Sequence, residues 1–98
     1  MEKIPREKID TVCNYFRSIF EGCEIDDKTI SKSNIQEFEI EWQGSKKIVA
    51  ITEEFFSFQD IQNIIQSLDH LGLVEHLEVL DKVKVIWKKN HALLEEYY

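Results

Sequence analysis

The sequence contains few of the residues that break, link or cross-link a chain. Its 98 residues include three glycines, one proline and two cysteines. The glycines stand alone at positions 22, 44 and 72, so the chain has no glycine-rich phosphate-binding loop. Two cysteines are too few for a disulfide framework, and we expect Cys13 and Cys23 to be reduced thiols. With no linker and no low-complexity tract, residues 1–98 are predicted to form a single globular domain.

Long apolar segments are absent as well. No apolar run approaches the roughly 18–20 residues that cross a bilayer. The N-terminal segment is rich in charge and lacks the apolar core of a signal peptide. These absences predict a cytoplasmic protein that does not contact a membrane.

Positive charge is scarce. The chain has 12 Lys and Arg against 19 Asp and Glu, which gives a net charge of −7. Direct binding of DNA or RNA requires a surplus of Lys and Arg that displaces counterions, and binding to an anionic membrane surface requires the same. We therefore expect neither. The acidic balance is explained by solubility alone or by a basic partner.

The clearest pattern runs from Ile35 to Thr52. Apolar and acidic residues alternate over residues 37–42, which is typical of a strand with one buried face. Gly44 then marks a tight turn. Residues 48–51 are all apolar, which is typical of a central strand that is covered on both faces. The stretch predicts a β-hairpin on which the remaining elements pack.

Two amphipathic helices are predicted on either side of this hairpin. Between Pro5 and Phe20, apolar residues recur at i, i+3, i+4 and i+7. The second helix is capped by Ser57 and runs to about His70, with Gly72 as the residue that ends it. A further strand is expected within residues 23–34.

The C-terminal third is predicted to complete the sheet. Alternation within residues 77–79 and 83–87 favours two strands that turn near residues 81–82, with a helical turn followed by one strand as the alternative. A short helix from His91 to Tyr98, capped by Asn90, is predicted to end the chain. The complete order is α-β-β-β-α-β-β-α, an α+β domain with a mostly antiparallel sheet and helices packed on one face.

Residues with catalytic or metal-binding chemistry do not form a recognisable set. His70, His76 and His91 have no partner at the spacing of a zinc site. Cys23 has no basic neighbour in the sequence that would lower its pKa. We therefore predict no cofactor and no metal, and we favour a non-catalytic protein over an enzyme.

One candidate functional surface is an acidic face formed by Glu37, Glu39, Glu41, Glu53 and Glu54. Alternate positions of a strand lie about 7 Å apart, which is close to the spacing of phosphates along a nucleic-acid strand. The row is consistent with an inhibitor that mimics nucleic acid and blocks a DNA- or RNA-binding protein. The alternative is that lysines of neighbouring strands pair with the row, so that the face is only solvated.

A second candidate surface is apolar. If helices cover one face of the sheet, Val49 and Ile51 remain on the other face, with Trp42 and Trp87 at its ends. These four residues are predicted to bind another protein, most economically a second copy in a homodimer.

The order of the elements resembles two known groups of proteins. The opening α-β-β-β-α resembles double-stranded RNA-binding domains, but these need basic residues at the start of the second helix. Here that position holds residues 57–60, Ser-Phe-Gln-Asp, so RNA binding is not implied. The full order, small size and acidity resemble the type III secretion chaperones. We therefore expect a small, acidic, non-catalytic protein-binding module, adaptor or chaperone-like, with the nucleic-acid mimic as the alternative.

Overall fold

The structure is a computed structural model, and it describes residues 4–97. In that part of the chain it contains four α-helices, one short 3-10 helix and five strands. In chain order they are α1 (Arg6–Ile19), β1 (Glu24–Ile30), η1 (Ser31–Ser33), β2 (Ile35–Trp42), β3 (Ser45–Thr52), α2 (Glu53–Phe58), α3 (Ile61–Leu71), α4 (Leu73–Val79), β4 (Lys82–Lys88) and β5 (His91–Glu96).

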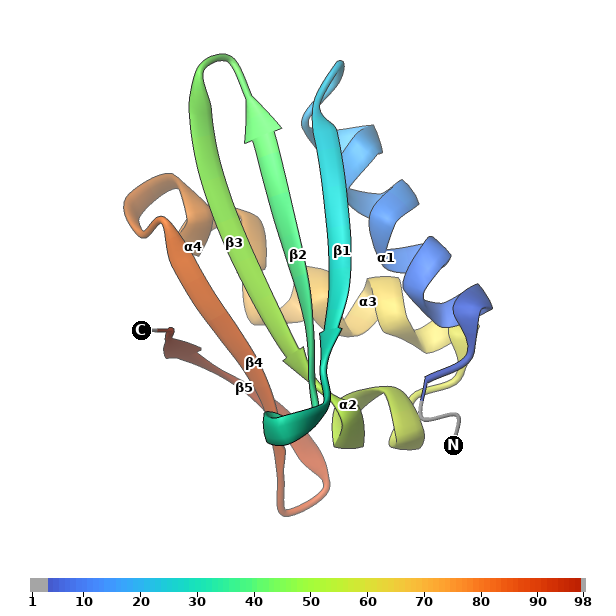
Figure 1. The fold of residues 1–98 in the computed structure, drawn as a ribbon. Helices are drawn as coiled ribbons and strands as arrows, with labels where there is room; N and C mark the ends of the chain where they lie inside the picture. Colours follow the sequence, from blue (N-terminus) through green and yellow to red (C-terminus); the bar gives the residue numbers. More distant parts are fainter. Residues whose placement is uncertain (1–3, 98) are drawn as a thin grey trace.

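The five strands form one sheet in the order β1-β2-β3-β4-β5 (Figure 1). Every neighbouring pair is antiparallel except β3 and β4, which are parallel. Parallel neighbours need a crossover connection, and α2, α3 and α4 together provide it. The predicted α+β class with a mostly antiparallel sheet is confirmed.

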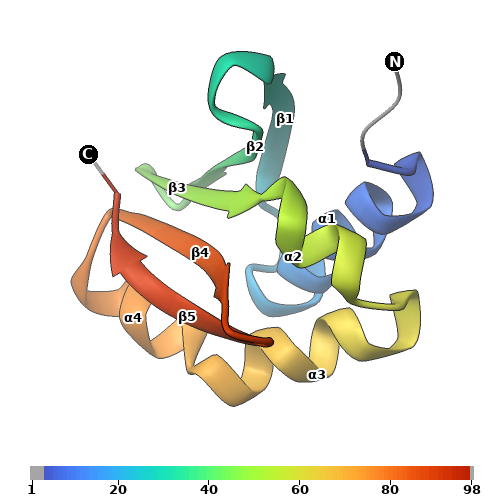
Figure 2. The ribbon, with the colours of Figure 1, turned by 90° about the horizontal axis from the view of Figure 1, so that it is seen from below.

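All four helices lie on one face of the sheet, which curves around them (Figure 2). We call this the helix-covered face and the opposite one the outer face. The core between sheet and helices contains large side chains from both layers. Fully buried members include Phe16, Phe38, Phe55, Phe56, Ile64, Leu68, Leu73 and Leu77. The predicted packing of helices on one face is therefore confirmed.

The predicted first helix and central hairpin are also confirmed. In α1, Ile9, Val12 and Phe16 are buried at helical spacing, as the apolar periodicity predicted. In the hairpin, Trp42 pairs with Ser45, which leaves a two-residue turn of Gln43 and Gly44. Both turn residues have positive φ, 50° and 79°, as a type I′ turn requires. Within residues 4–97, no helix is both long and apolar enough to cross a membrane.

The C-terminal third differs from the main prediction in two places. Residues 77–79, predicted as a strand, belong to helix α4, which buries Leu73 and Leu77 one turn apart. The alternative of a helical turn followed by one strand is correct. Leu77 and Val79 allowed either reading because a three-residue alternation is too short to separate a strand from a helix.

The predicted C-terminal helix is wrong, because residues 91–96 form strand β5. Lys88 pairs with His91, so Lys89 and Asn90 form a two-residue hairpin turn between β4 and β5. Their φ values of 52° and 68° match another type I′ turn. Asn90 therefore acts as a left-handed turn residue and not as a helix cap. Tyr98, the predicted last residue of that helix, lies outside the described residues.

Candidate functional site: a groove between α3 and β5

The predicted apolar surface is not an open face. Val49 and Ile51 are both 0 % exposed and point to the helix-covered face, where they form part of the core. Their placement on an uncovered face is wrong. The residues of β3 that point outward are the alternate ones, Ile48 and Ala50, and an apolar run does not reveal which alternate set faces the helices.

The two tryptophans have separate environments. The Trp42 ring packs edge-on against Phe20 at a centroid distance of 5.1 Å, and its indole N–H donates to the Glu21 carbonyl at 2.9 Å. The Trp87 ring contacts Phe55 edge-on and stacks on Phe58 at a centroid distance of 5.6 Å. Phe58 itself is 63 % exposed, so Trp87 and Phe58 bring an aromatic surface to the outside of the molecule.

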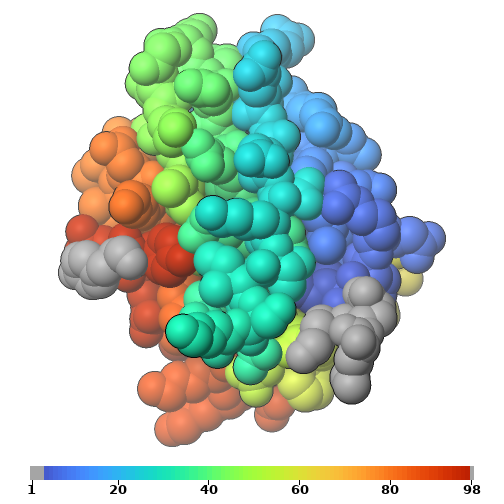
Figure 3. Space-filling model, in the orientation of Figure 1, coloured from blue at the N-terminus to red at the C-terminus, as the bar shows by residue number. Residues whose placement is uncertain are grey.

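The acidic residues of β2 share the outer face, as the alternation predicted. Figure 3 shows this face, with β1, β2 and β3 at its centre. With Glu24 and Asp26 of β1, Glu39 and Glu41 line a shallow hollow of about 210 Å³. Glu37 completes the row on β2. Glu53 and Glu54 are not part of the sheet and form the first turn of α2, where acidic side chains stabilise a helix.

The row of β2 is partly neutralised by cations from neighbouring strands. Lys46 of β3 lies 2.8 Å from Glu39, and Lys28 of β1 lies 3.7 Å from Glu37. The hydrogen bond from Lys46 lowers the pKa of Glu39. The Tyr97 hydroxyl also donates to Glu37 at 2.7 Å. These contacts agree with a paired, solvated face better than with a continuous row of free charges.

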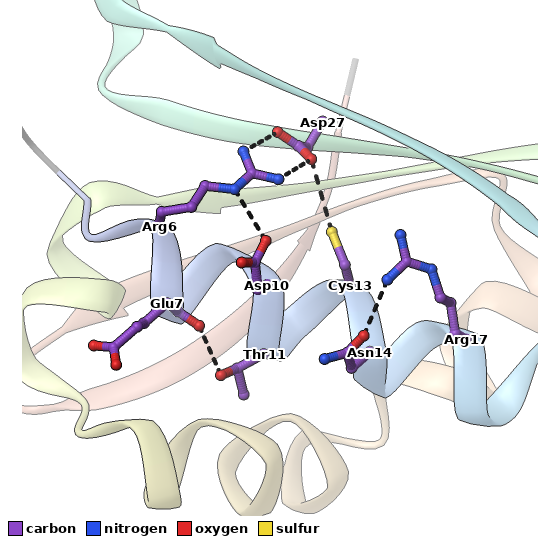
Figure 4. A network of polar contacts seen from close by, with 8 residues as sticks. All are labelled: Arg6, Glu7, Asp10, Thr11, Cys13, Asn14, Arg17 and Asp27. Atoms are coloured by element: carbon purple, nitrogen blue, oxygen red, sulfur yellow. Dashed lines mark hydrogen bonds and ion pairs between the residues drawn. The ribbon is translucent and has the colours of Figure 1, made fainter.

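The polar network around Cys13 is a structural contact between α1 and β1 (Figure 4). Arg6 donates two hydrogen bonds of 3.0 Å to the carboxylate of Asp27 and one of 2.9 Å to Asp10. The Cys13 thiol lies 3.8 Å from Asp27. Burial, followed by the charge of Asp27, raises the pKa of Cys13 to about 11. A thiol with a raised pKa is a poor nucleophile, so this network is not an activated cysteine site.

Titratable side chains do not converge elsewhere in a way that suggests a metal. Among the residues that the structure describes, no three His, Cys, Asp or Glu side chains are grouped closely enough to hold a metal ion.

A hollow of the described surface lies between helix α3 and the start of β5, and we call it the α3–β5 groove. Its volume is about 380 Å³. One wall is a stripe of α3 at positions 63, 66, 67, 70 and 71, a spacing that places side chains on one side of a helix. The other wall comes from the β4–β5 hairpin. The lining residues are Gln59, Asn63, Gln66, Ser67, His70, Leu71, Trp87, Asn90, His91 and Ala92.

The lining of the α3–β5 groove is polar but carries no carboxylate, Lys or Arg. Four of its residues are carboxamides: Gln59, Asn63, Gln66 and Asn90. None of these side-chain amides hydrogen-bonds to another residue within 4–97. A carboxamide offers both donors and an acceptor, which is the set that a peptide group also offers. Trp87 and Leu71 add apolar surface to the same groove.

The first residues of β5, His91 and Ala92, line the groove, and β5 is the last strand of the sheet that the described residues form. The Tyr97 N–H donates to the Lys82 carbonyl of β4 at 3.3 Å. Since N–H groups alternate in direction along a strand, those of residues 91, 93 and 95 also point to β4. The N–H and C=O groups of Ala92 and Leu94 therefore point to the open edge.

Sequence reasoning did not find this groove. The polar stripe of α3 has the composition of an ordinary solvated helix face, and only the neighbouring strand turns it into the wall of a groove. That strand was predicted as a helix. The signal that could have identified it is Lys89-Asn90 between two alternating segments, since Asn tolerates positive φ in a hairpin turn.

Comparisons with protein families, with curated proteins and with solved structures found no match to this chain.

Proposed function

We propose that this protein is a non-catalytic protein-binding module, of the adaptor or chaperone-like kind, and that the α3–β5 groove holds its partner. The observation that carries the proposal is the coincidence of unused hydrogen-bonding side chains and an open strand edge at one groove. A volume of about 380 Å³ accommodates several side chains of a partner segment.

The chemistry of the groove supports binding better than catalysis. Its titratable lining residues are His70 and His91, with no Cys, Asp, Glu, Lys or Tyr beside them. Catalysis by a nucleophile or by an acid–base pair needs a second group of that kind within hydrogen-bonding reach. Uncharged donors and acceptors instead suit recognition of a polar, uncharged segment.

Location and self-association belong to the same proposal. Both cysteines are free thiols, which suits a reducing compartment such as the cytoplasm. The predicted homodimer rested on Val49 and Ile51 at an open face, and their burial removes that basis. The nucleic-acid mimic is disfavoured because Lys46 and Lys28 pair with the acidic row.

The proposal is tested with a matched pair of substitutions on α3. Gln66 lines the groove, whereas Gln62 is exposed on α3 outside it. Gln66→Arg fills the groove with a long, charged side chain, and Gln62→Arg makes the same chemical change elsewhere. Both residue types are good helix formers, so both variants should fold.

The measurement is affinity capture from native lysate with the parent and both variants, washed at low and high salt. We expect a partner that the parent and Gln62→Arg retain and that Gln66→Arg loses. If every captured protein binds Gln66→Arg as well as the parent, the groove is not the site. A Glu39→Gln/Glu41→Gln protein is captured alongside them. A partner that the parent loses at high salt, and that this variant does not retain even at low salt, would support the mimic.

A further inference from the structure

We infer that the partner segment binds in an extended conformation and pairs with the open edge of β5, as a sixth strand of the five-stranded sheet. This inference rests on the proposed function, because it describes how the α3–β5 groove would hold its partner. Addition of a strand to a sheet edge is a general mode of peptide recognition, in which main-chain hydrogen bonds supply affinity and neighbouring pockets supply specificity.

The backbone of β5 supplies the first requirement, which is a set of unpaired groups. Ala92 and Leu94 direct two N–H donors and two C=O acceptors to the open edge, as the bond between Tyr97 and Lys82 establishes. No residue of the described chain bonds to these groups at that edge. An unpaired edge of this kind is a template for another strand unless charge, proline or a covering element blocks it.

The helix beside β5 supplies the second requirement, which is a wall that contacts the side chains of the added strand. Asn63, Gln66 and His70 follow one another along α3 on the side of the groove. A strand paired with β5 would point alternate side chains to this helix, since side chains alternate between the two faces of a sheet. The same segment of the partner would therefore pair with the edge of β5 and contact the polar stripe of α3.

The composition of the groove defines the kind of segment that fits. Its carboxamides and imidazoles favour uncharged polar side chains, and Trp87 with Leu71 favours one apolar side chain among them. A charged side chain would lose hydration without meeting an opposite charge, because the lining has no carboxylate, Lys or Arg. We therefore assign the site to an extended, uncharged segment of a partner protein.

A second copy of this chain is the competing occupant. Two β5 strands could pair antiparallel about Leu93, which would place Ala92 opposite Leu94 and His91 opposite Glu95 of the other copy. Stable homodimer interfaces are rich in apolar contact, however. On β5 the exposed large apolar side chain is Leu93, which is 36 % exposed. A homodimer would also have to cover the polar stripe of α3. The groove favours a foreign segment over self-pairing.

The probe is a peptide enriched from a random library displayed on phage, prepared as a free, monomeric peptide. Amide hydrogen exchange, measured by NMR on the full chain, reports on β5 with and without it. We expect the amide protons of Ala92 and Leu94 to exchange at least about tenfold more slowly in the complex, because they gain hydrogen bonds. The Leu93 amide, which pairs with β4, is the internal control and should change little.

The second measurement leaves the protein unmodified and changes the peptide backbone. N-methylation removes one donor and blocks one edge of an extended peptide. Methyl groups on one set of alternate residues should weaken binding by about tenfold or more, and methyl groups on the other set should be tolerated. Ala92→Pro, which removes an edge donor without breaking a bond to β4, should weaken binding comparably to the first set.

The outcomes separate this inference from the proposed function. If no peptide is enriched whose binding Gln66→Arg abolishes, the proposed function fails at this groove. If such a peptide binds but the amides of Ala92 and Leu94 are unaffected and both N-methylated sets bind equally, the groove stands and strand addition is overturned. Protection of these amides that rises with protein concentration and without peptide would show self-pairing and would overturn it as well.

Discussion

The two edge strands of the sheet differ in how their open sides are protected. Four of the seven residues of β1 are charged, Glu24, Asp26, Asp27 and Lys28, which is a common way to prevent an edge from pairing with another chain. In β5 the charges stand only at the end, and the strand begins His-Ala-Leu-Leu. One sheet thus has a protected edge and an open one, and the open one borders the α3–β5 groove.

The edges also differ in how they are held. β1 is bound to α1 through the two hydrogen bonds between Arg6 and Asp27 (Figure 4). The end of β5 is held by a hydrogen bond across the outer face, which the hydroxyl of Tyr97 donates to Glu37 of β2. The first contact joins sheet to helix, and the second joins two strands that are not neighbours. The open edge is therefore held at its far end, away from the groove.

The largest effect should come from β3, because it joins the half of the sheet that contains β1 to the half that contains β5. Val49→Ser with Ile51→Ser leaves cavities and buries two hydroxyl groups in the core. Together they should lower the free energy of unfolding by more than about 5 kcal/mol, which is comparable to the whole stability of a small domain. Urea unfolding followed by circular dichroism measures this.

Ile48→Ser is the control on the same strand, since Ile48 points to the outer face and is only half-buried. It should cost clearly less than either core substitution. If the Val49→Ser/Ile51→Ser protein unfolded near the parent midpoint, the two edges would not depend on a common core.

At the protected edge, Asp27→Asn should break the link between β1 and α1. The substitution removes the carboxylate that accepts both bonds from Arg6, and the pair is partly exposed, so we expect a loss of about 1–2 kcal/mol. Hydrogen exchange should rise in β1 more than in β5. Arg17→Gln, on the same helix and hydrogen-bonded within residues 4–97 only to Asn14, is the matched control and should have little effect.

Local patterns predicted the central hairpin better than the edge strand β5. The β2–β3 hairpin was predictable because Glu37–Trp42 alternates and Gly44 marks the turn, and α1 was predictable because its apolar stripe is long. β5 has only six residues, and Leu93-Leu94 suits either a helix or a strand. Its state depends on pairing with β4, which is a contact between segments and has no local signal.

The candidate site was less predictable than the fold for the same reason. Val49 and Ile51 lie in a run without a polar side, so the sequence could not assign the face that the helices cover. Asn63, Gln66 and His70 have no special pattern of their own. They form the wall of a groove only because β5 lies beside them. Because residues 91–98 were predicted as a helix, the sequence did not predict this groove.

At the open edge, Tyr97→Phe should remove the hydrogen bond to Glu37 while keeping the ring. Loss of a single partly buried bond should cost about 0.5–1.5 kcal/mol. Exchange should rise near the end of β5 and remain unchanged in β1, which is the reverse of Asp27→Asn. If both variants raised amide hydrogen exchange equally in β1 and in β5, the two contacts would not stabilise the two edges independently.

The smallest expected effect, a change in the pH dependence of stability, should separate the same two contacts. Burial and the charge of Asp27 raise the pKa of Cys13 from 9.0 to about 11. The hydrogen bond to Glu37, followed by burial, raises the pKa of Tyr97 above 10.0. A neutral acid with a raised pKa contributes stability below its unfolded pKa, and this contribution is lost as the pH rises through the folded pKa.

The free energy of unfolding should therefore fall as the pH rises above about 9, in two windows. Cys13→Ala should flatten the fall between about pH 9 and 11, by less than about 1 kcal/mol at pH 9.5, and Tyr97→Phe should flatten it only above about pH 10. Urea titrations at each pH compare each variant with the parent, because Tyr15 also has a raised pKa, through burial and its bond to Asp69. If the free energy of unfolding of Cys13→Ala fell as steeply as that of the parent below about pH 10, this part of the fall would not arise from the contact between α1 and β1.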